Sequence, residues 1–129
     1  MKKLITIVLA VAVLSLIGIA HAGSVYDRTT VTIPAAGSAT WTNQKDYSAL
    51  KLVRIWQVAA TASNDIAVTR ISADSVYTQT VGTVTGAATV PNSTATFTAA
   101  YLGVGDKLSF VSTPGTGGVV MLEYEVQQH

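Results

Sequence analysis

Short runs of alternating apolar and polar residues, each ended by a turn residue, recur along the chain from Gly23 onward. No window of about a dozen residues in that region has the three- and four-residue apolar spacing of an amphipathic helix. Alternation with a period of two, interrupted by Gly, Pro, Asn, Asp or Ser, is typical of strands joined by tight turns. The pattern therefore predicts an all-β domain.

About eight strands are expected between residues 23 and 129, a spacing typical of a single antiparallel β-sandwich. The alternation predicts them at 25–33, 38–42, 50–60, 66–72, 76–84, 93–99, 107–112 and 119–126. A jelly-roll and an immunoglobulin-like topology both fit this pattern. The core is expected to contain Leu52, Val58, Ile66, Val68, Phe97, Leu108, Phe110, Leu122 and Tyr124.

The first 22 residues form a separate segment. Lys2 and Lys3 precede an apolar run over residues 4–20, and Ala20-His21-Ala22 then places small residues at the two positions that a signal peptidase reads. This order is the pattern of a secretory signal peptide, so we expect residues 1–22 to be removed on export.

The alternative for this segment is a retained membrane helix, because about 17 residues at 1.5 Å each span roughly 26 Å, close to the ~30 Å of a hydrocarbon core. In both cases the two lysines keep the N-terminus in the cytoplasm. Residues 23–129 are therefore expected to be extracytoplasmic: secreted, periplasmic, or associated with a cell surface or a virion. Contact with a membrane is expected only if residues 1–22 are retained.

Residues that usually carry catalysis are scarce. The chain has no cysteine, which excludes disulfides, thiolate metal sites and cysteine nucleophiles. Of its two histidines, His21 lies at the predicted cleavage site and His129 is the last residue, so no Ser-His-Asp arrangement is expected. Glu123 and Glu125 share one strand face roughly 7 Å apart, which suits an inverting glycosidase, but neighbours on one strand rarely flank a substrate. We expect no enzymatic activity and no cofactor.

Charge and metal-ligand patterns are weak. Asn64, Asp65 and Asp74 offer the oxygen ligands that calcium prefers, but turn chemistry accounts for them, so no metal site is predicted. Beyond Lys2 and Lys3, six basic residues face seven acidic ones, a net charge of about −1. A weakly charged chain binds phosphates poorly, so we expect no nucleic-acid partner.

Trp41 is the best candidate for an exposed aromatic ring that stacks on a sugar. It lies between two threonines on a short predicted strand, and a loop containing Asn43 and Gln44 follows it. These three residues form the candidate ligand-binding group, and a glycan is the partner that they suggest.

Two residues of the predicted strand 50–60 stand out. Trp56 shares the alternation of Leu52 and is therefore expected in the core. Arg54 is unusual on so apolar a strand. It is expected to pair with a carboxylate such as Asp65 or Asp74, to stack on Trp56, or to reach an interface.

The first and last strands are the candidate assembly strands. They carry apolar side chains and few of the charges that usually protect sheet edges, and the residues that we single out are Val25, Val31, Ile33, Val119 and Met121. Such strands add to a neighbour's sheet by β-augmentation, although in a monomer the two could equally pair within one sandwich.

The sequence therefore predicts an exported, non-enzymatic structural subunit. We expect it to form a homo-oligomer through its β-edges, as in a surface filament, an appendage or a virion-type assembly. The alternatives are an extracytoplasmic carbohydrate- or ligand-binding module and a β-domain tethered to a membrane by a retained N-terminal helix.

Overall fold

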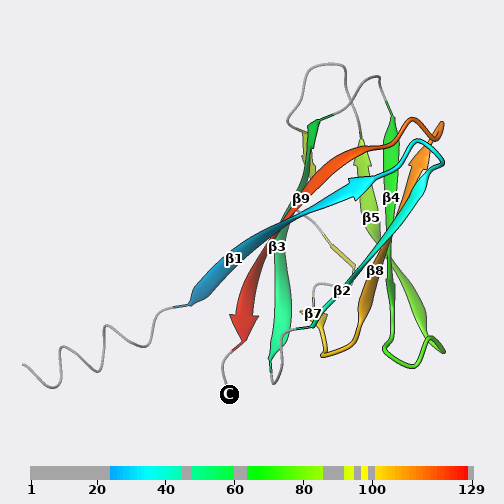
Figure 1. Ribbon diagram of the computed structural model, residues 1–129. Helices are drawn as coiled ribbons and strands as arrows, with labels where there is room; N and C mark the ends of the chain where they lie inside the picture. The colour runs from blue at the N-terminus through cyan, green and yellow to red at the C-terminus, as the bar shows by residue number, and fades with distance from the viewer. Residues whose placement is uncertain are drawn as a thin grey trace, which may run out of the picture.

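The computed structural model describes residues 24–44, 48–59, 64–85, 92–94, 97–98 and 101–127. These residues form nine strands and no helix (Figure 1), which confirms the all-β prediction. The predicted export segment, residues 1–22, and His129 lie outside the described residues. Within the described ranges, no helix is long and apolar enough to cross a membrane.

The strands form two antiparallel sheets. The first sheet has the order β1-β9-β3-β6, with β7 also paired to β3, and the second has the order β2-β8-β4-β5. The strands of the first sheet are β1 (Val25–Ile33), β3 (Ala49–Ala59), β6 (Asn92–Thr94), β7 (Tyr101–Leu102) and β9 (Gly118–Gln127). Those of the second are β2 (Ser38–Thr42), β4 (Asp65–Ile71), β5 (Thr78–Thr85) and β8 (Lys107–Thr113).

The strand predictions agree with these bounds closely, except around the β4–β5 hairpin and the short strands β6 and β7. Strand β5 begins at Thr78, two residues later than predicted, because the hairpin turn continues to Tyr77. In that turn the Ser72 amide donates to the Tyr77 carbonyl at 2.8 Å, and Ser75 takes a positive φ of 63°. The two-residue strand β7 is too short for alternation to reveal.

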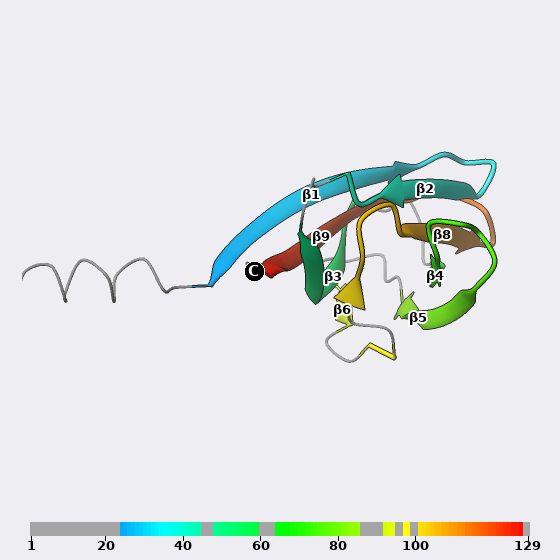
Figure 2. The same ribbon diagram turned by 90° about the horizontal axis from the view of Figure 1, so that it is seen from below.

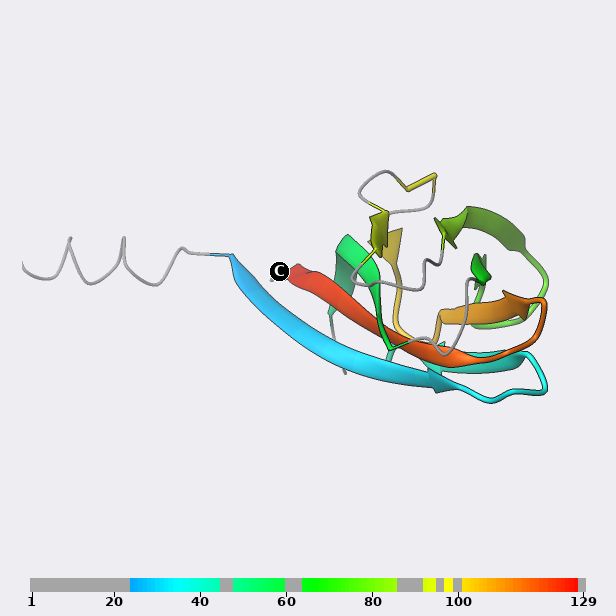
Figure 3. The ribbon, with the colours of Figure 1, turned by 90° about the horizontal axis from the view of Figure 1, so that it is seen from above.

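Apolar side chains from both sheets form one buried cluster, and the second sheet faces the first across it (Figures 2 and 3). Seven of the predicted core residues are confirmed as buried: Leu52, Ile66, Val68, Leu108, Phe110, Leu122 and Tyr124. An eighth, Phe97, is partly buried and packs against this cluster.

A β-bulge at Val53 reverses which face of β3 is buried. The register between β3 and β9 shifts between Leu52 and Arg54, so Val53 is an extra residue on the bulged strand. Before the bulge Leu52 points into the core, whereas after it Ile55 and Gln57 are the buried residues. A bulge of this kind moves every following side chain to the opposite face.

Two core predictions on β3 are wrong for this reason. Unbroken alternation from Leu52 places Trp56 and Val58 inward, but both are half-buried on the outer side of the sheet. Gln57 takes the inward position instead and is fully buried. A second register shift follows between Gln57 and Ala59.

The buried Gln57 belongs to a chain of polar contacts between the sheets. Its Nε2 donates to Oδ1 of Asn64 at 2.7 Å, and Asn64 Nδ2 donates to Ser112 Oγ at 3.0 Å and to the Gly117 carbonyl at 2.6 Å. Asn64 therefore joins β3 to β8 and to the β8–β9 hairpin, since buried polar groups are costly without partners.

A second polar cluster lies at the other end of the second sheet, around Asp106. Its carboxylate accepts from Arg70 Nε at 3.0 Å and Nη2 at 2.6 Å, from the Ala73 amide at 3.1 Å and from the Gly103 amide at 2.9 Å. The predicted turn at 103–106 is confirmed, because the Asp106 amide donates to the Gly103 carbonyl and Gly105 has a φ of +83°. One carboxylate thus connects β4, the β4–β5 hairpin and the β7–β8 turn.

Candidate functional site

Strand β1 is an edge strand of the first sheet. In the described part of the chain it is hydrogen-bonded only to β9, over its full length from Val25 opposite Val126 to Ile33 opposite Gly118. The register has no shift, and β1 contains no Pro, Gly or Lys. Pro, Lys and bulges are the usual devices that protect an edge from pairing with another chain. We therefore treat β1 as the candidate assembly edge.

The N-terminal half of β1 reaches beyond the second sheet, together with the C-terminal end of β9 (Figures 2 and 3). The inward-facing side chains show this as a gradient: Ile33 is 2% exposed, Val31 is 8% exposed and Val25 is 45% exposed. Between them, Asp27 accepts a hydrogen bond from the Tyr124 hydroxyl at 3.2 Å. The inner face of β1 is thus covered at one end and open at the other.

The outer face of the first sheet carries a charged cluster built across three strands. Arg28 of β1 and Arg54 of β3 both lie opposite Glu123 of β9. Arg28 Nε is 2.6 Å from Glu123 Oε2, and Arg54 Nη2 is 3.5 Å from the same oxygen. The two guanidinium groups also lie over the Trp56 ring, at 5.7 and 4.5 Å from its centre. Arg54 therefore stacks on Trp56, which is one of the predicted roles, and its carboxylate partner is Glu123.

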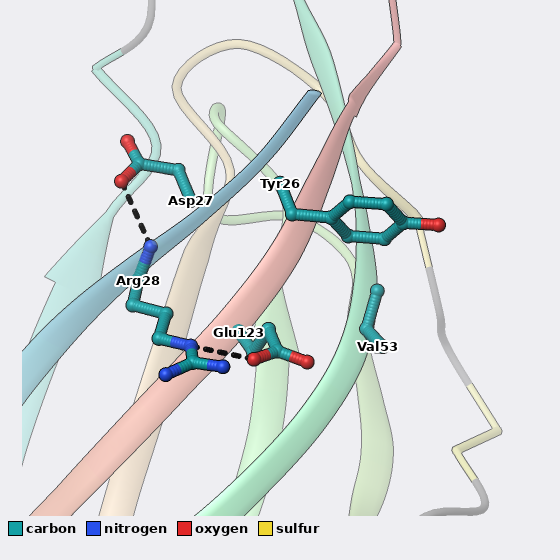
Figure 4. Close-up of a pocket in the computed structure, with 5 residues that line it drawn as sticks. All are labelled: Tyr26, Asp27, Arg28, Val53 and Glu123. Atoms are coloured by element: carbon teal, nitrogen blue, oxygen red, sulfur yellow. Dashed lines mark hydrogen bonds and ion pairs between the residues drawn. The ribbon is translucent and has the colours of Figure 1, made fainter. Parts of the chain in front are cut away.

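An open hollow of about 760 Å³ lies beside this cluster. It is lined by Tyr26, Asp27, Arg28, Val53 and Glu123. Figure 4 shows the Tyr26 ring extending toward the bulged residue Val53, with the Arg28–Glu123 pair alongside and Asp27 pointing away. The ring is largely exposed, whereas the Glu123 side chain is only 14% exposed. The hollow thus combines an aromatic ring, an apolar floor, one guanidinium and one carboxylate.

The predicted ligand-binding group is divided between the core and the surface. Trp41 is half-buried, packs against the core and lies 5.8 Å from the Tyr124 ring centre. Asn43 is fully buried, and its Nδ2 donates to the carbonyls of Ser48, Leu102 and Gly103. Gln44 is exposed. The structure therefore gives Asn43 a role in holding loops together.

The predicted assembly residues also have different environments. Strand β9 lies between β1 and β3, so the backbone at Val119 and Met121 is paired on both sides and forms no free edge. The expected edge at the last strand is thus corrected, because the first and last strands pair with each other. Val25 remains exposed on the edge strand, whereas Val31 and Ile33 are part of the core.

The remaining candidates do not gather into one site. Glu123 and Glu125 lie on the outer face of β9, and Glu123 is engaged by arginine. Asn64 is buried in the polar chain between the sheets, Asp65 begins β4 and Asp74 lies in the β4–β5 hairpin. Among the described residues there is no group of three or more His, Cys, Asp or Glu that could hold a metal.

Asp74 organises the β4–β5 hairpin. Its Oδ1 accepts from the Ser72 hydroxyl and from the Val76 amide. These bonds hold the pKa of Asp74 below its ordinary value of 3.8, because both favour the ionised carboxylate. The bond from the Ser72 hydroxyl has the larger effect, and the bond from the Val76 amide comes next.

Sequence reasoning did not find the hollow or the charged cluster beside it. Tyr26 and Arg28 alternate on the polar face of the first strand, but their partners depend on the register with β9 and on the bulge at Val53. Pairing between residues that are far apart in sequence carries no local signal.

Comparison with known proteins gives a likeness of fold. No protein-family model matches the chain, and no curated protein matches it. One similar solved structure is the NLP core of Drosophila, described in connection with pentamer formation and histone binding. It is 15% identical in sequence, with a TM-score of 0.50, and the match covers 83% of this chain and all of that one. The chain is thus similar to that protein in its all-β architecture.

Proposed function

We propose that this chain is an exported, non-enzymatic structural subunit that self-associates through the edge strand β1. The observation that carries the proposal is the position of β1 at the end of its sheet: among the described strands, this nine-residue strand pairs only with β9, and with no shift in register. Val25 adds an exposed apolar side chain at its open end. Long, regular edges of this kind are ready templates for pairing with another chain.

The proposed architecture is a jelly-roll β-sandwich. The strand orders β1-β9-β3-β6 and β2-β8-β4-β5 place consecutive strands in opposite sheets at most connections. This interleaving, with the first and last strands adjacent, favours a jelly roll over the immunoglobulin-like alternative. Jelly rolls are common in capsid proteins, which is consistent with a role in assembly.

The similar Drosophila structure adds limited support. It is described as forming a pentamer, so a chain of this general fold can assemble with copies of itself. Histone binding is not part of the proposal. Histones are strongly basic, and the residues beyond 22 carry a net charge of only about −1.

The proposed location is extracytoplasmic, because residues 1–22 have the pattern of a signal peptide.

The absence of catalysis is proposed because the Glu123 carboxylate is already paired with two arginines. Glu125 lies on the same strand and does not oppose Glu123 across a cleft.

The test is the mass of the exported protein, measured by light scattering after size-exclusion chromatography. Val25→Lys places a charge at the open end of β1 and is expected to weaken self-association about tenfold. Val76→Lys is the matched control, because Val76 is 84% exposed in the β4–β5 hairpin and not on this edge. A strictly monomeric wild-type protein at high micromolar concentration contradicts the proposal, as does equal weakening by both variants.

A further inference from the structure

The hollow on the outer face of the first sheet has a chemistry that self-association does not require. Its lining brings together an aromatic ring, an apolar side chain and an ion pair within about 760 Å³. Volumes of about 300–1,000 Å³ are typical of small-molecule sites. Strand β3 is bulged at Val53, next to the hollow, and bulges are often found where a strand is shaped for a binding site.

The ring of Tyr26 is available for stacking. It is 59% exposed, although it lies beside the apolar side chain of Val53 in the same hollow (Figure 4). An aromatic ring beside an aliphatic floor forms a surface for the C–H face of a flat, ring-shaped ligand. The phenol hydroxyl adds a polar group at the rim.

The Arg28–Glu123 pair offers a donor next to an acceptor. Arg28 Nε donates to Glu123 Oε2 at 2.6 Å, which fixes the two side chains against each other. The Arg28 side chain is still 60% exposed, and Figure 4 shows the other carboxylate oxygen of Glu123 directed toward Val53. A guanidinium beside a carboxylate oxygen matches two adjacent hydroxyls, because each hydroxyl both donates and accepts.

The charges of the lining argue against an ionic ligand. Asp27 and Glu123 are acidic and Arg28 is basic, and Arg54 adds a second positive charge next to Glu123. Asp27 points away from the hollow, and the Glu123 carboxylate is already paired with Arg28 and Arg54, so an ionic ligand has to compete with these pairs for its counter-charge. A neutral ligand with several hydroxyls forms its hydrogen bonds without that competition.

We infer that this hollow is a binding subsite for a neutral, hydroxyl-rich ligand, namely a pyranose unit of a neutral glycan. Tyr26 stacks on the sugar ring, while Glu123 and Arg28 hydrogen-bond to neighbouring hydroxyls. The ligand class is the one suggested by the sequence for Trp41, but the residues are different and lie on the other sheet.

The test is a titration of the isotope-labelled exported protein with methyl glucoside, methyl mannoside and methyl galactoside, followed by NMR. We expect saturable shifts of the Tyr26, Val53 and Glu123 amides with at least one glycoside. Tyr26→Ala is expected to weaken binding roughly tenfold, because the stacking surface is removed. The control is Tyr77→Ala, since Tyr77 is 55% exposed but lies in the β4–β5 hairpin, outside the hollow.

The inference is overturned if no neutral glycoside gives a saturable shift at tens of millimolar. It is also overturned if only methyl glucuronate or inorganic phosphate produces shifts. A third contradicting result is glycoside binding that is unchanged in both Tyr26→Ala and Glu123→Gln. Light scattering of the same samples shows whether self-association has changed. Glycoside binding by a monomer supports the inference even if the assembly proposal fails.

Discussion

Replacing Asp106 with alanine removes the carboxylate that connects strand β4 to two turns of the chain. Asp106 is 6% exposed and accepts four hydrogen bonds, two from Arg70 and one each from the amides of Ala73 and Gly103. The alanine variant leaves the Arg70 guanidinium without its counter-charge, and it leaves both amides without this acceptor. We expect a large loss of stability with no change of fold.

The magnitude follows from burial. Removing one partner of a buried ion pair costs about 3–5 kcal/mol. Water recovers part of that cost, because the Arg70 side chain is 26% exposed, so we expect a loss of about 2–4 kcal/mol. With a urea dependence of about 1.5 kcal/mol per molar, the unfolding midpoint falls by roughly 2 M.

The assay is equilibrium unfolding in urea, followed by tryptophan fluorescence. Asp65→Ala is the control, because Asp65 is an exposed carboxylate on β4 and such a substitution changes stability by about 0.5 kcal/mol or less. If the two variants unfold at the same urea concentration, the role assigned to Asp106 is refuted.

Four further variants test the turns and the buried polar chain. Asn64→Ala leaves a buried glutamine amide on β3 without its acceptor and is expected to lower the free energy of unfolding in urea by about 2 kcal/mol. Gly117→Ala puts a Cβ against the Ile33 carbonyl oxygen at a φ of +74°, so a loss of about 2 kcal/mol or more is expected. Gly103→Ala meets only ordinary contacts and stays close to wild type. The pKa of Asp74 is lowered in the folded protein, chiefly by the Ser72 hydroxyl. The ionised Asp74 therefore stabilises the hairpin fully above about pH 3.8, and this stabilisation is lost as the pH falls through the lower pKa of the folded state. NMR shifts of the hairpin amides should report that loss in the wild type and be flat with pH in Asp74→Asn.

The architecture was largely predictable because its signals are local. Alternation and turn residues fix the strand 25–33 without any knowledge of its partner, and the same holds for the turn at 103–106. Most of the core follows as well, since an inward-facing position repeats every second residue along a regular strand. The predictions failed on β3, where the bulge at Val53 changes the faces of Trp56 and Val58.

The candidate site was less predictable because it depends on contacts between distant strands. Arg28 and Glu123 are 95 residues apart in sequence and meet only through the register of β1 and β9. Asn43 looks like an exposed loop residue in the sequence, yet its side chain is fully buried and its amide donates to three carbonyl groups. Alternation indicates which face a side chain occupies, but it does not indicate which neighbour it contacts.

Amide hydrogen exchange at low and high protein concentration tests the central claim most directly. If copies pair along β1, the exchange of amides in Val25–Ile33 slows as the protein concentration rises. Amides of β5, Thr78–Thr85, which is an end strand of the second sheet, are unaffected. Val25→Lys should move the concentration dependence to about tenfold higher protein concentration, and Val76→Lys should leave it unchanged. Exchange in β1 that is the same at every concentration would contradict assembly through this strand.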